Sequence, residues 1–202
     1  MAQRSIKTIT DFKAKLQGGA ARPNLFEVSI PTFPDAVKDG WDDETFNFLC
    51  KSAALPASNI APIDVPFRGR ILKVAGDRTF DTWTVTVIND EDFKLRSSFE
   101  RWMNTMNKLD NSTGATNPGS YMVDAYVHQL GRGDRRFSTN NNSNPTSNSL
   151  RTYKFYSIFP TNVSQIDLSY DTSDTIEEYT VEFQVQWWQA MGDDQTGIEI
   201  SW

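Results

Sequence analysis

Few residues in this chain of 202 could catalyse a reaction or hold a metal. His128 is its single histidine and Cys50 its single cysteine. A nucleophile–base–carboxylate triad would need His128 as its base, and no Gly-x-Ser-x-Gly turn that would present a nucleophile precedes it. One histidine and one cysteine also fall short of the ligands of a tetrahedral zinc site. We therefore expect no enzymatic activity, no metal and no cofactor.

Acidic side chains are numerous, but they are not spaced as a catalytic pair. Asp42–Asp43 and Glu177–Glu178 are adjacent in the sequence, and adjacent residues of a strand point to opposite faces. A glycosidase needs two carboxyl groups that converge across a cleft. These residues are therefore expected to be solvated surface charges.

The overall composition excludes several classes of protein. The chain has 26 acidic and 20 basic residues, a net charge of −6, so it lacks the basic surface with which proteins bind nucleic-acid phosphates. No apolar run approaches the ~18 residues that span a bilayer. The aromatic content of 12% argues against global disorder. We expect one folded domain, residues 1–202, that is made in the cytosol and makes no membrane contact.

The elements that would position these residues are mostly strands. From Thr79 to Ile88, Trp83, Val85 and Val87 alternate with threonines, and Tyr179–Trp188 repeats this period of two with one apolar and one polar face. Apolar alternation also predicts strands at Phe26–Ile30 and at Phe46–Cys50, where Phe46, Phe48 and Cys50 share a face. Further β-rich stretches are Tyr121–His128, Arg151–Phe159 and Val163–Tyr170, with Pro160 between the last two.

One segment has helical rather than strand periodicity. Asn89 or Asp90 can cap a helix with Glu91 and Asp92 in its first turn, and an apolar stripe follows from Phe93 to Met106. A weaker helix is indicated at Ile6–Leu16. The predicted fold is therefore mainly β, an antiparallel β-sandwich or barrel with one flanking α-helix at about residues 89–108. Residues 31–43 and 138–149, rich in proline or in serine and asparagine, are predicted loop insertions.

The segment Ala57–Val74 has an unusual composition. Pro56, Pro62 and Pro66 stiffen it, and its apolar residues are too many for a free surface loop. We expect a long projecting loop or hairpin, with folding back onto the core of the same chain as the alternative. The contact candidates are Ile60, Ile63, Val65, Phe67, Arg68, Arg70 and Ile71.

Four blocks of sequence resemble the tail tube protein family of T-even-type contractile-tailed bacteriophages. They keep the family's order and span Ala21 to Trp188. The blocks are Ala21–Phe26, Cys50–Ala57, the longest block Val74–Glu91, and Pro160–Val163 with the strands that follow it. Residues 31–43, 138–149 and a C-terminal extension at 189–202 depart from the family pattern.

The resemblance implies a structural virion protein with a β-barrel-like subunit, similar in fold to the tube protein of type VI secretion systems. Such subunits form hexameric rings stacked into the inner tube of a contractile tail, the conduit for DNA ejection. The implied partners are further copies of the chain and the sheath, baseplate, tape-measure and tail terminator proteins, with DNA passing the lumen without specific binding. Assembly would take place in the host cytoplasm and the product would reside in the virion.

Two polar strand faces are candidates for the wall of the lumen. A wall around DNA should be neutral or acidic, because lysines would bind phosphates by counterion release. The candidates are Glu178, Thr180, Glu182, Gln184 and Gln186 on one strand and Thr82, Thr84 and Thr86 on the other. The alternative reading, suggested by the six tryptophans, is a carbohydrate-binding β-sandwich module.

Overall fold

The computed structural model describes residues 8–16, 20–35, 37–38, 40–132, 149–171 and 173–191. Contacts divide the chain into two units, described separately below: Met1–Glu27, Val127–Tyr153 and Ala190–Trp202 form the first, and Val28–Tyr126 and Lys154–Gln189 the second. Among the described helices, none has the length and apolar character needed to cross a membrane.

Two antiparallel sheets account for the strands, which confirms the predicted mainly β class. In the larger sheet the strand order is β1–β6–β7–β8–β5–β2, with β9 also paired to β7, and β3 and β4 form the second sheet. The strands are β1 (Phe26–Ser29), β2 (Cys50–Ala53), β3 (Ser58–Phe67), β4 (Arg70–Phe80), β5 (Trp83–Ile88), β6 (Val123–Leu130), β7 (Ser149–Val163), β8 (Glu178–Gln184) and β9 (Trp187–Met191).

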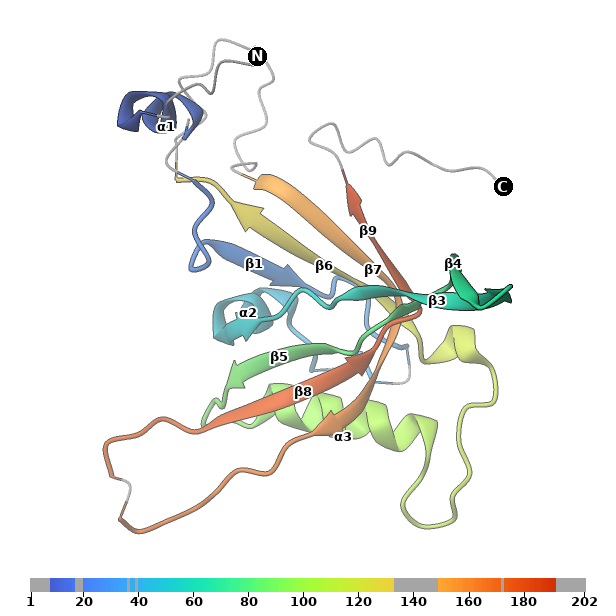
Figure 1. Cartoon of the computed structure of the whole chain (residues 1–202). Coiled ribbons are helices and arrows are strands. Elements are labelled where there is room, and N and C mark those ends of the chain that lie inside the picture. Colours follow the sequence, from blue (N-terminus) through green and yellow to red (C-terminus); the bar gives the residue numbers. More distant parts are fainter. Residues whose placement is uncertain are drawn as a thin grey trace, which may run out of the picture. The chain divides into compact units, whose positions relative to one another are not determined.

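The core of the second unit lies on the apolar side of β5 and β8. Their alternating pattern buries Val85 and Val181 completely, as a sheet with one covered face requires. Helix α3 (Lys94–Met106) lies along this side (Figure 1). Its Phe99 ring packs edge-on against Phe183, with 5.8 Å between ring centroids. The predicted flanking helix is therefore confirmed.

Helix α3 begins later than predicted. It starts at Lys94, and its N-cap residue is Phe93, whose side chain makes no capping hydrogen bond. Asn89 does not cap it, because both its backbone and its side-chain amide donate to Glu177, each at 2.9 Å. These bonds hold Asn89 beside the chain that enters β8. The prediction that Asn89 or Asp90 caps this helix is therefore wrong.

The strand predicted at Phe46–Cys50 is also wrong, because residues Asp43–Leu49 form helix α2. The Asp42 carboxylate caps this helix by accepting from the Glu44 backbone N–H at 3.1 Å, and acidic residues in the first turn suit the helix dipole. Phe46 is buried whereas Phe48 is 78% exposed, so the two rings do not share a face. Only Cys50 belongs to a strand, as the first residue of β2.

Strand β7 differs from prediction at both sides of Pro160. The strand continues through Pro160, which lies opposite Phe183 next to a register shift in the β7–β8 ladder, and a proline is tolerated at such a bulge. The chain then leaves the sheet after Val163, so the strand predicted at Val163–Tyr170 does not form.

The described residues of the predicted loop at 31–43 form no helix or strand before α2, but they are not a free surface loop. Phe33 stacks on Trp41 at 4.2 Å and meets Trp102 of α3 edge-on at 4.7 Å. The Trp41 indole N–H donates to the Ile30 carbonyl at 3.0 Å. Described residues of this loop therefore contribute to the core of the second unit.

In the first unit, helix α1 (Ile9–Lys15) lies within the predicted Ile6–Leu16 segment, whose first two residues are outside the described part. Thr8 and Asp11 form a capping box at its start. The Gln129 side chain donates to the carbonyls of Arg22 and Leu25, both at 2.7 Å. Residues 138–148 of the predicted insertion and 192–202 of the predicted extension lie outside the described residues.

Candidate assembly surfaces

Strands β5 and β8 place their polar side chains on one face of the sheet. Thr84 lies opposite Glu182, and Thr86 lies opposite Thr180. Residues directly opposite each other in an antiparallel ladder point to the same side. Gln184 shares this side, since it lies two residues beyond Glu182. We call these five residues the polar face; it is turned away from α3, which packs on the other side of both strands.

The neighbouring strands extend the polar face. Asn162 of β7 lies opposite Glu182, and Ser52 of β2 lies opposite Thr86. Sequence reasoning missed both residues, because the alternation within one strand does not reveal which distant strand lies beside it.

Three of the predicted lumen residues lie at the margin of this face. The Glu178 carboxylate is paired with the Lys51 ammonium at 2.5 Å. Thr82 precedes β5 and is exposed. Gln186 lies in the bend between β8 and β9, where its backbone N–H donates to the Tyr156 carbonyl at 3.3 Å. The predicted single strand Tyr179–Trp188 is thus broken after Gln184, so its polar residues do not form one continuous row.

Glu182 is the one charged residue of the polar face. Its cross-strand neighbours, Thr84 and Asn162, are uncharged. No ion pair joins its half-buried side chain to a described residue. The polar face therefore has at its centre a negative charge that no described residue compensates.

Side chains of α3 pack against the opposite side of β8. Tyr179 is buried, and the Arg96 guanidinium lies 5.3 Å from the centre of its ring. Burial raises the pKa of the Tyr179 phenol, because the charged form loses its hydration. Arg96 is anchored by a 3.1 Å bond from its guanidinium to the Ser164 carbonyl. Strand β8, which carries Glu182 on its polar side, is thus packed against α3 on its other side.

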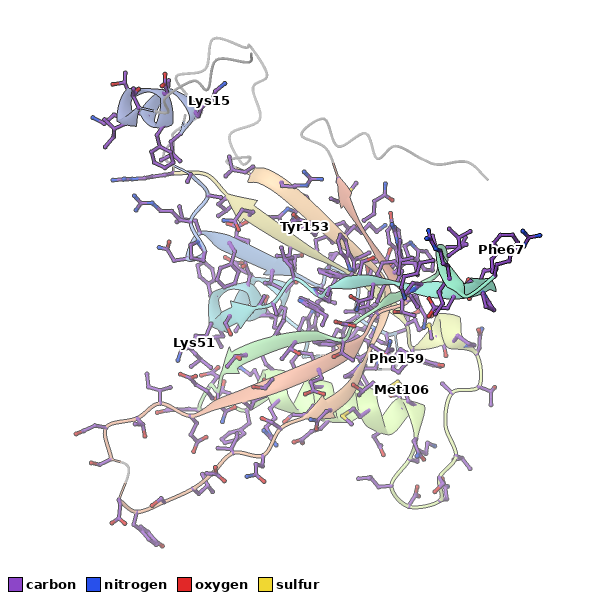
Figure 2. The ribbon with its side chains drawn as sticks, in the orientation of Figure 1. Lys15, Lys51, Phe67, Met106, Tyr153 and Phe159 are labelled. Atoms are coloured by element: carbon purple, nitrogen blue, oxygen red, sulfur yellow. The ribbon has the colours of Figure 1, made fainter. Side chains whose placement is uncertain are left out.

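The second candidate surface is the hairpin of β3 and β4, which extends away from the larger sheet (Figure 1). Its turn residues Arg68 and Gly69 have φ angles of 45° and 79°, as a two-residue type I′ turn requires. Phe67 and Arg70 close this turn as a cross-strand pair. Figure 2 shows Phe67 at the outer end of the hairpin, and its side chain is 66% exposed.

The two faces of the hairpin differ in polarity. Ile63 lies opposite Val74 and Val65 opposite Leu72, so one face is almost wholly apolar. The other face carries Ile71 and the ion pair of Asp64 with Lys73 at 2.9 Å. All ten residues of β3 are exposed. We call Ile63, Val65, Phe67, Leu72 and Val74 the apolar hairpin face.

The register separates the predicted hairpin candidates. Ile63, Val65 and Phe67 lie together on the apolar hairpin face, whereas Ile71 belongs to the opposite face. Ile60 lies beyond a register shift near Gly76. A Cβ atom at Gly76 would come 2.5 Å from the Ala61 carbonyl oxygen, so the close approach of the strands there requires glycine.

A cluster on β6, β7 and β9 was not predicted from the sequence. The Lys154 ammonium pairs with Asp124 at 3.0 Å and lies 4.3 Å from the centre of the Tyr156 ring. Tyr156 in turn stacks on Trp187 at 5.1 Å. The lysine is therefore neutralised by its own chain.

The residues considered for catalysis occupy ordinary structural positions. His128 Nδ1 lies 2.9 Å from the Thr152 hydroxyl. Cys50 is buried, and burial raises the pKa of its thiol to about 12. Within the described ranges, no three histidine, cysteine or acidic side chains are grouped as a metal site would need.

Comparison with known proteins places the chain in a family. The profile of the family described as "Phage tail tube protein" matches residues 21–191. The tail tube protein gp19 of Enterobacteria phage T4 is 34% identical over 172 residues, covering 85% of this chain and 93% of that protein; for gp19 of phage T6 the identity is 33% with the same coverage. A chain of the extended sheath–tube complex of an extracellular contractile injection system has the same fold, with a TM-score of 0.56, 14% identity, and coverage of 93% of this chain and 99% of that one. The chain belongs to the phage tail tube protein family.

Proposed function

We propose that this chain assembles into six-membered rings that stack head to tail as the inner tube of a contractile tail, through which DNA leaves the virion. Besides family membership, the observation that carries the proposal is the exposed apolar hairpin face. A lone exposed apolar side chain is ordinary, but five contiguous ones on a projecting hairpin mark an interaction surface. A contact between two different surfaces of identical subunits does not close on itself, so it propagates into a tube.

The hairpin is proposed to pack against a neighbouring subunit of the same or the next ring. Its apolar hairpin face would be covered there, with Arg68 and Arg70 at the rim of the contact. Strand β2 ends the strand order of the larger sheet. No other described strand pairs with its outer edge, so this edge can receive a strand of the neighbour within a ring, and such pairing protects an edge from aggregation.

The polar face is proposed to line the bore, with Thr82, Glu178 and Gln186 at its margin. Six-fold repetition would turn Glu182 into a ring of carboxylates that repel phosphates over about a Debye length, roughly 8 Å at physiological salt. The threonine, glutamine and asparagine side chains around it offer phosphates no positive charge. Such a wall lets DNA pass without holding it.

Reversing the charge of Glu182 tests the position of the polar face. Glu182→Lys tubes should assemble and retain DNA at low salt, with retention that falls steeply as salt rises, because each new phosphate contact releases counterions. Glu91→Lys is the matched control: it makes the same charge change at an exposed residue of the turn that precedes α3. If Glu182→Lys tubes bind no more DNA than Glu91→Lys tubes, the polar face does not line the bore.

The proposed tube also implies partners, a role and a location for the chain. Further copies of the chain, the sheath, the baseplate, the tape-measure protein and the tail terminator are the proposed partners. The role is structural rather than enzymatic. Assembly is proposed to occur in the host cytoplasm, and the final location is the virion tail.

A further inference from the structure

The two outer edges of the β3–β4 hairpin are not equivalent. Phe67 and Arg70 close a two-residue turn, so they form a hydrogen-bonded pair, and pairs alternate along the ladder from there. The backbone groups of Pro62, Asp64 and Pro66 on β3 therefore point outward, as do those of their partners on β4.

Prolines close one of these edges. Between the turn and the register shift, β3 has three outward-facing residues, and two of them, Pro62 and Pro66, lack an N–H group. This stretch of the edge therefore cannot form a continuous ladder with another strand. On β4 the outward-facing residues are Ile71, Lys73 and Ala75, and all three have an N–H. Because β4 pairs only with β3 among the described strands, its outer edge is open.

The connection between β7 and β8 has the sequence of a strand without its structure. Residues 166–171 alternate, with Ile166, Leu168 and Tyr170 on one side and Asp167, Ser169 and Asp171 on the other. Leu168 is 80% exposed and Tyr170 is fully exposed. Residues 164–171 belong to no helix or strand of the described chain.

Charge and position make this segment complementary to the hairpin. Residues 58–80 carry four basic and two acidic side chains, whereas residues 164–177 carry four acidic side chains and no basic one. Both belong to the second unit. They lie at opposite ends of it, the hairpin at the right and the β7–β8 connection at the lower left of Figure 1. One chain cannot join them to each other, but two chains can.

We propose that residues 166–171 become a strand in the assembled tube by pairing with the open edge of β4 in a second copy of the chain. Leu168 and Tyr170 then extend the apolar hairpin face of that copy, and the aspartates lie on the side of Lys73. Strand addition of this kind takes its affinity from backbone hydrogen bonds and its specificity from the alternating side chains. The proposal rests on the proposed tube assembly and names the surface that receives the hairpin.

Hydrogen exchange in the free chain and in tubes seeded by baseplates tests the pairing. The amides of residues 166–170 should exchange at least about tenfold more slowly in tubes, as should those of Ile71 and Lys73, because new backbone bonds protect them. Tubes in which residues 166–170 exchange as fast as in the free chain overturn the pairing while the tube proposal stands. A parent chain that forms no tubes overturns both.

A pair of proline variants isolates the edge. Lys73→Pro removes the central outward N–H of β4, and Asp64→Pro makes the same change at its cross-strand partner on the closed edge. Both variants break the same ion pair. Lys73→Pro should raise the concentration needed for assembly at least about tenfold, and Asp64→Pro should leave it within about twofold. Equal effects of the two variants, including equal loss of assembly, contradict the proposal.

Discussion

Leu72 and Ile71 offer a direct comparison of the two hairpin faces. They are adjacent on β4, similar in size, and exposed by 62% and 63% in the free chain. Leu72 lies on the apolar hairpin face, opposite Val65, whereas Ile71 points to the other side. Replacing each by alanine therefore removes the same apolar surface from opposite faces.

The expected magnitude follows from the surface that remains exposed. Fully burying a leucine side chain contributes about 1.5–3 kcal/mol. Since about two-thirds of Leu72 is still exposed, assembly can gain about 1–2 kcal/mol from covering it. A change of this size in the free energy of adding one subunit corresponds to about a 5- to 30-fold change in the critical concentration.

Sedimentation of tubes from solutions of increasing protein concentration measures this critical concentration. Leu72→Ala should raise it by the factor given above, and Ile71→Ala by clearly less. The free energy of unfolding of the free subunit should change by less than about 0.5 kcal/mol in both variants, because both side chains are exposed. The reasoning is refuted if Ile71→Ala matches or exceeds Leu72→Ala, or if neither changes assembly.

Two further outcomes concern the subunit itself. Phe183→Ala should lower the free energy of unfolding by about 3–5 kcal/mol, because it leaves a cavity where the ring contacts Phe99 and Trp102. Phe48 is 78% exposed, so Phe48→Ala should change the free energy of unfolding by less than about 0.5 kcal/mol in the same denaturant titration. Cys50, with a thiol pKa raised to about 12, should not react with thiol reagents at about pH 8 until the chain is unfolded. A rapid reaction of the folded chain would show that the thiol is accessible. Because the pKa of this thiol is higher in the folded chain, the free energy of unfolding should fall as the pH rises above about 9, where the unfolded thiol ionises.

The alternation of Thr84, Thr86, Thr180 and Glu182 with valines was sufficient to predict the polar face, because a period of two fixes the side on which each residue lies. The alternation could not predict that Asn162 and Ser52 complete this face. Their positions depend on the register between strands far apart in the sequence, and the ladder of β7 with β8 contains a bulge. Gln186 was misplaced for a similar reason, since the chain bends after β8.

A short apolar alternation gave a wrong prediction at Phe46–Cys50, because a helix-capping residue precedes the segment. Phe46 and Phe48 read as one face of a strand, but the Asp42 carboxylate and the acidic first turn favour helix α2. The same pattern at residues 166–170 is typical of a strand, yet these residues are in no strand of the described chain. Alternation indicates that a segment can form a strand, but the segment becomes one only where a neighbouring strand is available.

Electron microscopy of the purified chain, seeded by baseplates, tests the central claim most directly. The account predicts hollow tubes of stacked six-membered rings, with the β3–β4 hairpin of each subunit in contact with another copy and the polar face toward the bore. A chain that stays strictly monomeric at high concentration in the presence of baseplates, or that forms tubes with its hairpins free in solvent, would contradict it.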